Sequence, residues 1–270
     1  MRIEPRWAPC LAALVLLGTS GIGAQTKYQS GQNIAPVYEG WRRQSDGTFA
    51  MYFGYLNRNY AEVLDIPVGA NNAFDAGTDR GQPTHFLPRR HRFVFQVALP
   101  REWDPQRRLI WTITANGKTE KAQGWLQPEW EIDDGVIQMN IGPGGAPPAD
   151  PPNTPPRISG DAEASVTFPQ TLTLSITAID DGVPKAPPVR AGQPPRDAPS
   201  LTCRWIHYRG PGVVTFETPA ASGPNTAAVR SSTRVTFSAP GVYVLHAIAS
   251  DGLFETHHEV TVTVRPPAER

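Results

Sequence analysis

Histidine suits proton transfer and metal binding near neutral pH, and four of the chain's six histidines form two short groups. His85 and His91 flank Arg89-Arg90, and His257-His258 are adjacent in a segment of strand-like alternation. Adjacent residues of a strand point to opposite faces, so the last two cannot bind one ion together. No Cys/His spacing matches a structural zinc site. These histidines are interpreted as solvated surface residues, and no metal site is predicted.

Acidic residues follow two strand-like runs, in Asp180-Asp181-Gly182 and Ser250-Asp251-Gly252. Carboxylates gathered at one pole of a sandwich could hold calcium, which takes six to eight oxygen ligands. The spacing defines no calcium loop, however, and Asp-Gly is favourable turn chemistry. A turn role is therefore the preferred interpretation. Asp65, Asp75 and Asp79 are weaker candidates for the same chemistry.

A basic segment, Arg89-Arg90-His91-Arg92, precedes another strand-like run and could meet a polyanion such as an acidic glycan. The alternative is an ordinary solvated loop that continues into the polar face of a strand. Aromatic residues are also dense before residue 141. Alternation should bury about half of them, and an exposed remainder could stack on sugar rings, although core packing is the favoured interpretation. This aromatic set is Trp41, Tyr52, Phe53, Tyr55, Trp111, Trp125 and Trp130.

Known catalytic motifs are absent from the sequence: it has no serine nucleophile elbow, no phosphate-cradling glycine loop and no HExxH. Paired carboxylates of a glycosidase are recognised only by their separation in space, and nothing singles out a pair. We therefore predict no catalytic residue, no cofactor and no enzymatic activity. The 25 basic and 25 acidic side chains balance, so net charge does not support nucleic-acid binding.

The N-terminal 24 residues have the pattern of a secretory signal peptide. Arg2 and Arg6 precede a short apolar run at 11–17, and small residues lead to a cleavage site after Ala24. The expected mature chain is exported, without a membrane span, to the periplasm, the cell surface or the outside. Cleavage would remove Cys10 and leave Cys203, so we expect no internal disulfide and a buried thiol on a strand.

A Pro/Gly-rich segment at 142–156 is predicted to link two modules, because proline fixes φ and lacks an amide donor. The first module, 35–141, has alternating or aromatic runs and an Asn116-Gly117 hairpin signal. The turn-rich stretch 65–88 is interpreted as a long loop between its first two strands. The expected strands are 49–57, 92–99, 109–115 and 118–126.

The second module, 157–265, contains about seven strand-like runs, the number typical of an immunoglobulin-like sandwich. The expected strands are 165–168, 171–178, 202–208, 213–216 and three alternating runs within 232–264. A Pro-rich insertion at 184–199 interrupts the series. Trp205 is expected to fill the space between the two sheets, and Tyr243 to form a tyrosine corner. The fold class is therefore all-β, with two β-sandwich modules in series.

The second module resembles bacterial PKD-like and Ig-like repeats of secreted proteins. The resemblance rests on Trp205 leading into Gly210-Pro-Gly212, then Pro240-Gly241-Val242-Tyr243, then Ser250-Asp-Gly252, in that order. It implies a β-sandwich that works as a spacer or binding module. The first module is similar to a module of uncharacterised exported bacterial proteins, on Tyr38-Glu-Gly-Trp41, 53–59 and 80–90. That similarity implies no activity.

Three functions are left open. The leading hypothesis is a non-catalytic exported protein that binds an unknown protein or glycan partner, or acts as a spacer. The second is a carbohydrate-binding protein that uses the aromatic residues of the first module, tested at Trp41 and Trp130. The third is a hydrolase with its site in the 65–88 loop, which requires a deep polar pocket there.

Overall fold

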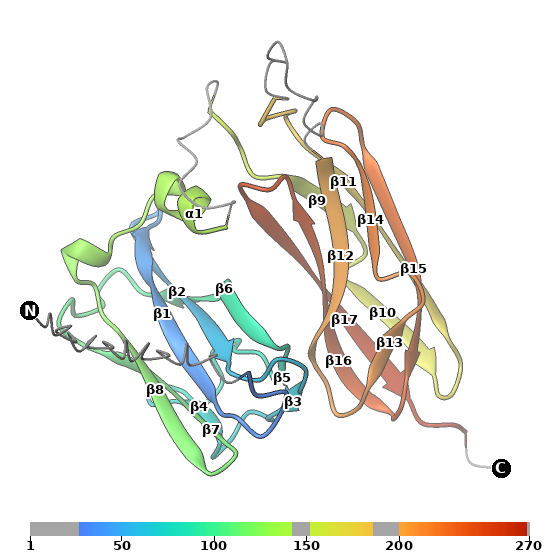
Figure 1. Cartoon of the computed structure of the whole chain (residues 1–270), viewed down its shortest axis with the longest axis horizontal. Coiled ribbons are helices and arrows are strands. Elements are labelled where there is room, and N and C mark those ends of the chain that lie inside the picture. The colour runs from blue at the N-terminus through green and yellow to red at the C-terminus, as the bar shows by residue number, and fades with distance from the viewer. Residues whose placement is uncertain (1–26, 142–151, 186–199, 269–270) are drawn as a thin grey trace, which may run out of the picture.

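A computed structural model describes residues 27–141, 152–185 and 200–268, and most of their regular structure is β-strand (Figure 1). The all-β prediction is thereby confirmed. The predicted signal peptide, most of the 142–156 linker and most of the 184–199 insertion lie outside the described residues. Strands up to residue 124 pair only with one another, and strands from residue 157 onward do the same.

The first module encloses its core between two three-stranded sheets. One sheet has the order β1-β2-β6, and the other has the order β4-β7-β8. The larger apolar side chains of both sheets face inward, with Met51, Phe53, Trp111 and Ile113 fully buried. The strands are β1 (Ile34–Arg43), β2 (Phe49–Asn57), β4 (Asn72–Phe74), β6 (Arg89–Leu99), β7 (Leu109–Ala115) and β8 (Lys118–Gly124).

A β-bulge in β1 brings both Tyr38 and Trp41 into this core. Tyr38 pairs with Phe53, but Gly40 rather than Glu39 pairs with Tyr52. The extra residue shifts the alternation by one position, so the side chains of Tyr38 and Trp41 face the same side of the sheet. This is why Trp41 is buried instead of exposed.

The stretch 65–88 is not one long loop, and that prediction is wrong. It contains β4 and the short pair β3 (Leu64–Asp65) and β5 (His85–Phe86). Asn72 organises the segment: its amide donates to the carbonyls of Ile66 and Pro83 at 3.0 and 2.8 Å. Its Oδ1 accepts from the Trp111 indole at 2.9 Å. Asn72 thus occupies a buried strand position where an apolar residue would be expected. The alternation by which a strand is normally recognised is therefore missing from β4.

Two short helical elements follow β8, a 3-10 turn η1 (Pro128–Trp130) and the helix α1 (Asp134–Ile141). Neither was expected from the sequence. The helix lies at the upper end of the first module in Figure 1, on the side of the second module. Ile132 and Ile137 there form a buried cluster with Phe254, and Tyr52 and Phe93 pack against it.

The second module is a sandwich of a five-stranded and a four-stranded sheet, which fits its expected Ig-like or PKD-like character. The five-stranded sheet runs β10-β17-β16-β12-β14 and the four-stranded sheet β13-β15-β11-β9. β9 and β14 are additional to the predicted strands. Bounds are β9 (Arg157–Gly160), β10 (Glu163–Thr167), β11 (Leu172–Ile179), β12 (Ser200–Arg209), β13 (Val214–Phe216), β14 (Ala220–Pro224), β15 (Val229–Phe237), β16 (Gly241–Ser250) and β17 (Glu255–Arg265).

The inner faces of these sheets hold the residues predicted to be structural. Trp205 is buried, and its indole donates to Ser231 Oγ at 3.0 Å. The Tyr243 hydroxyl donates to the Ala239 carbonyl at 2.8 Å, as expected of a tyrosine corner. Cys203 lies buried in the same core as a free thiol, and burial raises its pKa.

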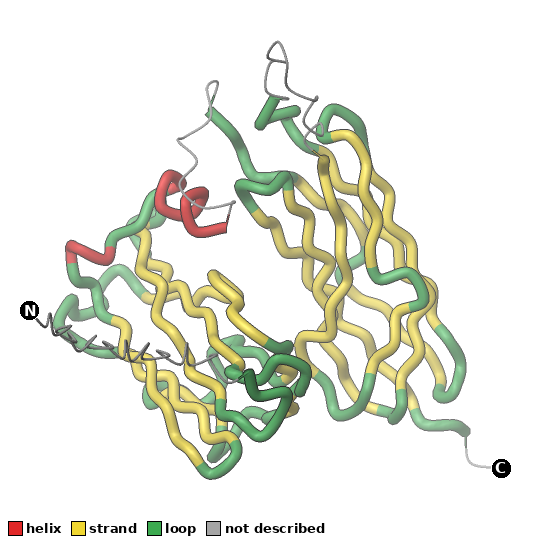
Figure 2. The backbone as a smooth tube through the Cα atoms, in the orientation of Figure 1, coloured by secondary structure: helices red, strands yellow, loops and turns green. Residues whose placement is uncertain are grey.

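The two modules lie side by side, and the first faces the outer surface of the five-stranded sheet (Figure 2). They meet in two places. At one end, Phe254 before β17 packs with Ile137 of α1. At the other end, β5 of the first module lies against β12 of the second.

Candidate functional site

A cleft between these two contacts is the candidate site, and we call it the junction cleft. It has one lobe of about 390 Å³ and another of about 530 Å³. The lobes share Arg92, Val94, Ile141, Glu255 and His257, so they form one continuous depression. Residues of both modules line each lobe.

One wall comes from the outward positions of β12, β16 and β17, where alternation places Arg204, Tyr208, His246 and His257. The inward neighbours of Arg204 and His246 form the core, and a bulge between His207 and Arg209 ends the alternation of β12. Tyr208 stacks on His246 with ring centroids 3.9 Å apart. Burial raises the pKa of Tyr208 and lowers that of His246.

The opposite wall comes from a wide bulge in β6. Pairing with β2 jumps from Phe53–Phe95 to Tyr55–His91, which leaves Arg92, Phe93 and Val94 outside the ladder. Phe93 has φ of 49°, a left-handed conformation that is costly for a bulky residue. The bulge brings Arg92 and Val94 into both lobes of the cleft.

The arginines beside this bulge are held by separate partners. Arg90 contacts the Glu39 carboxylate at 2.6 Å and donates to the His91 carbonyl at 2.7 Å. Burial raises the pKa of Glu39, and Arg90 opposes that rise. Arg92 donates to the Asn140 carbonyl at 2.6 Å, and Arg89 lies 3.8 Å from the centre of the Tyr60 ring. The segment 89–92 therefore does not present the continuous basic strip that polyanion binding would use.

A partly exposed ion pair lies on the floor of the cleft. Arg204 Nη2 is 3.0 and 3.1 Å from the two carboxylate oxygens of Glu255, and His257 Nε2 lies 3.8 Å from that carboxylate. Burial favours the neutral acid, but His257 and Arg204 outweigh it and lower the pKa of Glu255 to about 2. Glu255 is thus an anion throughout the neutral range.

The lower contact between the modules is mainly polar. The guanidinium of Arg209 pairs with both oxygens of Asp79 at 2.8 and 3.1 Å, and its Nε donates to the Gln82 carbonyl at 2.7 Å. The Thr84 amide donates to the Tyr208 carbonyl at 3.1 Å, and the Tyr208 hydroxyl donates to the Gly81 carbonyl. Asp79, considered above for metal binding, therefore has a docking role.

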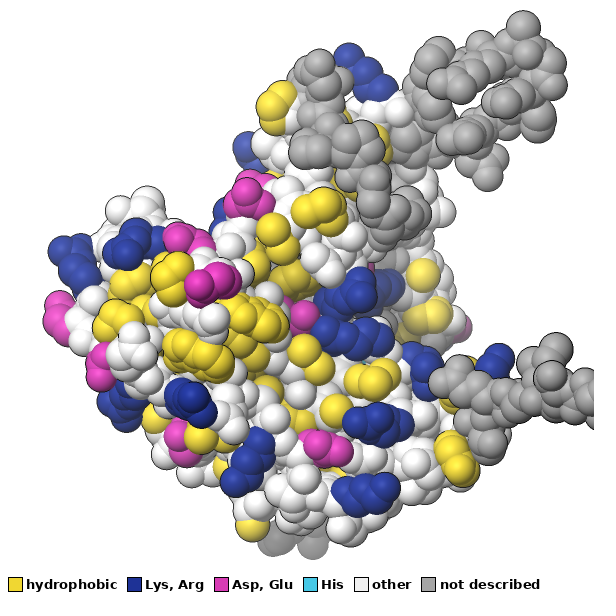
Figure 3. Space-filling view, turned by 60° about the vertical axis from the view of Figure 1, so that its left-hand side comes forward, with side chains coloured by type: hydrophobic (Ala, Val, Ile, Leu, Met, Phe, Trp, Pro, Cys, Tyr) yellow, Lys and Arg dark blue, Asp and Glu magenta, His cyan; other side chains and the backbone are white. Residues whose placement is uncertain are grey.

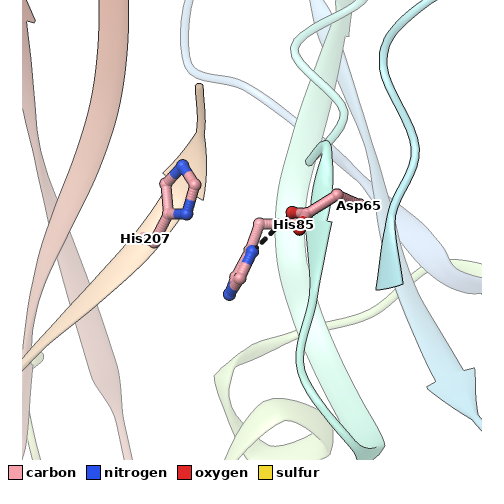
Figure 4. Close-up of side chains that lie close together, drawn as sticks. All are labelled: Asp65, His85 and His207. Carbon is pink, nitrogen blue, oxygen red and sulfur yellow. Dashed lines mark hydrogen bonds and ion pairs between the residues drawn. The ribbon is translucent and has the colours of Figure 1, made fainter. Parts of the chain in front are cut away.

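Beside this contact, Asp65 and His85 of the first module meet His207 of the second (Figure 4). His85 Nδ1 is 2.7 Å from Asp65 Oδ1, and the two imidazole rings have centroids 4.3 Å apart. One potential ligand atom from each residue lies within 4.8 Å of the other two. His207 is only 5% exposed, and neither of its ring nitrogens has a hydrogen-bond partner.

The histidines as a group are placed differently from the sequence interpretation. Five of the six line the junction cleft: His85, His91, His207, His246 and His257. The solvated-surface interpretation, made for His85, His91, His257 and His258, is wrong for the first three. The adjacent His257 and His258 do point to opposite faces, and His258 lies 3.2 Å from the Asp161 carbonyl. His207 and His246 were not identified from the sequence. A strand pattern can indicate that such a residue is buried, but it does not show which distant residue it contacts.

The acidic residues at one end of the second module, Asp180, Asp181 and Asp251, stabilise turns. Asp180 and Asp181 accept from the amides of Gly182 and Val183, and Asp251 accepts from Leu253 and Phe254. Burial and the neighbouring carboxylates of Asp251 and Asp181 raise the pKa of Asp180 to about 6. No group of three acidic or histidine ligands forms at this pole among the described residues.

Most of the candidate sugar-binding aromatics are in the core. Trp41, Phe53, Tyr55 and Trp111 are buried, and the Trp41 indole donates to the Gln127 carbonyl at 2.7 Å. Trp130 is 42% exposed and stacks on Tyr38 at 5.5 Å. Hydrophobic side chains gather on one part of the face in Figure 3, while Lys and Arg are spread over it among Asp and Glu.

The hydrolase hypothesis requires a deep polar pocket in the 65–88 stretch, and the hollow beside β3 carries a single carboxylate. This hollow has a volume of about 450 Å³, and Asp65 is the only ionisable residue that lines it. A glycosidase needs two carboxyl groups across the scissile bond. The lining of this hollow supplies one.

No family model and no curated protein matches the chain. Among solved structures, domains 4 and 5 of the S-layer protein SbsC are similar at 13% identity and TM-score 0.26, over 59% of this chain and 65% of that one. A human PKD domain is similar at 17% identity and TM-score 0.22, over 47% and 100%. The D0-D1 domain of intimin is similar at 12% identity and TM-score 0.25, over 85% and 97%.

At these TM-scores the likeness carries no argument about function, and the fold assignment rests on the sheets described above. The chain spans less than two thirds of the length of the S-layer fragment. No comparison supports the resemblance of the first module to exported bacterial modules. In the described parts of the chain, no helix has the length and apolar character needed to cross a bilayer.

Proposed function

We propose that this chain is a non-catalytic exported protein whose two docked β-modules bind a partner or act as a spacer at the cell surface or in the periplasm. The observation that carries the proposal is the double docking around the junction cleft. An apolar contact at Phe254 and a polar contact at Arg209 hold the modules at two separated points. Two points fix an orientation, which a single flexible contact would leave free.

The junction cleft is the proposed ligand-binding surface. Its lining mixes apolar side chains, such as Val94, Ile141 and Ile248, with arginine, histidine and glutamate groups, so it offers both contact area and hydrogen bonds. Arg204 and Glu255 neutralise each other, and Arg90 is occupied by Glu39. The imidazoles of His91 and His257 each have one nitrogen beside a partner, the Pro88 carbonyl and the Glu255 carboxylate, and their other nitrogens are the adaptable hydrogen-bonding groups of the cleft. A neutral polar ligand, such as a glycan or peptide segment, suits this surface better than a polyanion.

Carbohydrate binding by exposed aromatics is the second candidate, and Trp130 is the observation that favours it. Its exposed indole can offer a ring face to a sugar, whereas Trp41 is buried and unsuited to contact a ligand. Replacing Trp41 would remove core packing, so loss of binding in Trp41→Ala would not identify a glycan site.

Glycan and peptide arrays probed with the whole chain test both candidates. Loss of a detected ligand in His257→Gln, with retention in Trp130→Ala, supports the cleft. The reverse pattern favours the aromatic site. Binding that neither variant changes contradicts both locations, and turnover of an array ligand by the purified protein contradicts the non-catalytic proposal.

A further inference from the structure

The cluster of Asp65, His85 and His207 has the composition of a transition-metal site. Two imidazole nitrogens and one carboxylate oxygen are ligands that Zn²⁺ accepts, usually with tetrahedral geometry. The candidate atoms lie within 4.8 Å of one another. Tetrahedral zinc with bonds of about 2.0–2.1 Å would bring them to roughly 3.4 Å. Side-chain rotation would have to open the 2.7 Å contact between His85 and Asp65 to that spacing and shorten the longer distances of the set.

His207 is the independent observation that points to a ligand. A buried polar group without a hydrogen bond costs free energy, so such groups nearly always have a partner. His207 is only 5% exposed, yet neither of its ring nitrogens has a hydrogen-bond partner among the described residues. In Figure 4 the His85 ring lies between the His207 ring and the Asp65 carboxylate, and the two imidazole rings are close together.

The position of the cluster makes it accessible to an ion from solvent. The side chain of Asp65 is 61% exposed, so an ion can reach its carboxylate from solvent. The cluster borders a lobe of the junction cleft, through which an ion and a water molecule can enter.

We propose that Asp65, His85 and His207 bind one Zn²⁺ or a similar divalent transition metal, with water as the remaining ligand. Asp65 and His85 belong to the first module and His207 to the second. The metal would therefore cross-link the modules beside the Asp79–Arg209 pair and tighten their docking. This role goes beyond ligand binding in the cleft and does not depend on it.

Titration of the metal-free whole chain with Zn²⁺, against a fluorescent chelator, tests the proposal. We expect one equivalent to bind, and Co²⁺ to give the intense visible absorption of a tetrahedral site. His85→Ala and Asp65→Asn should each weaken binding by at least about tenfold, in line with the effect of disturbing a metal site. Both residues belong to a short strand pair and have side chains that are at least partly exposed, so these variants should fold even where the buried His207→Ala does not.

His258→Ala is the matched control, because it removes a histidine that lies on the opposite face of β17. It should bind Zn²⁺ as the wild type does. A thermal-unfolding midpoint that rises with Zn²⁺ in the wild type and His258→Ala, but not in His85→Ala, supports the cross-linking role. Absence of stoichiometric binding in the wild type overturns the proposal. Unchanged binding in both His85→Ala and Asp65→Asn, or loss in His257→Ala alone, also overturns it.

Discussion

At the scale of single residues, several side chains have their effect through one well-defined partner. Asn72, Glu255 and Tyr243 are buried or nearly so, and each satisfies a specific group on a neighbouring element. Buried polar groups of this kind stabilise mainly because leaving a partner unsatisfied is expensive. Substitutions that remove one partner are therefore more informative than changes at exposed sites.

Tyr243→Phe should lower the free energy of unfolding of the second module by about 1 kcal/mol, the usual contribution of one hydrogen bond. The ring would stay packed against Phe237, while the Ala239 carbonyl would lose its donor. Urea denaturation measures the difference. Val242→Thr, at a position that is 59% exposed, is the control and should stay within about 0.5 kcal/mol of the wild type. Equal stability of Tyr243→Phe and wild type would refute a stabilising corner.

Glu255 should make the protein lose stability in acid. Its folded-state pKa, about 2, is below the ordinary value of 4.5, so its contribution is complete above about pH 4.5. The contribution declines as the pH falls toward 2, because protonation then favours the unfolded chain. The full effect is at most roughly 3 kcal/mol.

Urea denaturation of wild type and Glu255→Gln between pH 7 and 2 checks this prediction. The stability advantage of the wild type should shrink over the window from 4.5 to 2. Glu129→Gln, at an exposed carboxylate, should follow the wild type at every pH. A constant difference between wild type and Glu255→Gln over that window would be inconsistent with the ion pair.

At the scale of elements, the irregularities position the cleft. The bulge in β6 lies opposite Gly54 of β2, and the bulge in β1 lies next to it, opposite Phe53 and Tyr52. A Cβ at Gly54 would overlap the His91 carbonyl and the Glu39 carboxylate. Gly54 is required because these two groups approach its Cα closely, and its backbone conformation would accept any residue.

Gly54→Ala should therefore destabilise the first module by about 1–3 kcal/mol, the range for overpacking a tight site. It should also disturb the Glu39–Arg90 pair and the cleft wall formed by the bulge. Gly135→Ala in α1 is the control, because its nearest neighbour, an Asp133 oxygen, would lie 3.2 Å away. Thermal unfolding of the two variants measures the contrast. A Gly54→Ala variant as stable as Gly135→Ala would contradict the close approach.

Regular strands were predictable where alternation was clear. The expected runs 49–57 and 109–115 coincide with β2 and β7. β1 was not recognised because Pro36 and Gly40 interrupt its pattern, and β4 because Asn72 replaces an apolar residue. These elements depend on a bulge and on one buried amide, neither of which leaves a periodic signal.

At the scale of the whole molecule, the candidate site depends on docking, which local sequence does not encode. His85 and His207 are far apart in the chain, and each lies in an unremarkable run. Their meeting follows from the position of β5 against β12. The division into two groups of strands was visible in the sequence, but the cleft between them was not. Structural roles were correctly predicted for Trp205 and Tyr243, because the partners of both residues lie within the second module and do not depend on docking.

Small-angle X-ray scattering of the whole chain is the most direct test of the docked arrangement. The account predicts that the wild-type curve fits one compact conformation with the modules side by side. Arg209→Ala should broaden the distance distribution, because it removes the Asp79 and Gln82 contacts. A wild-type curve that requires two modules at variable separation would contradict the docking, and with it the junction cleft.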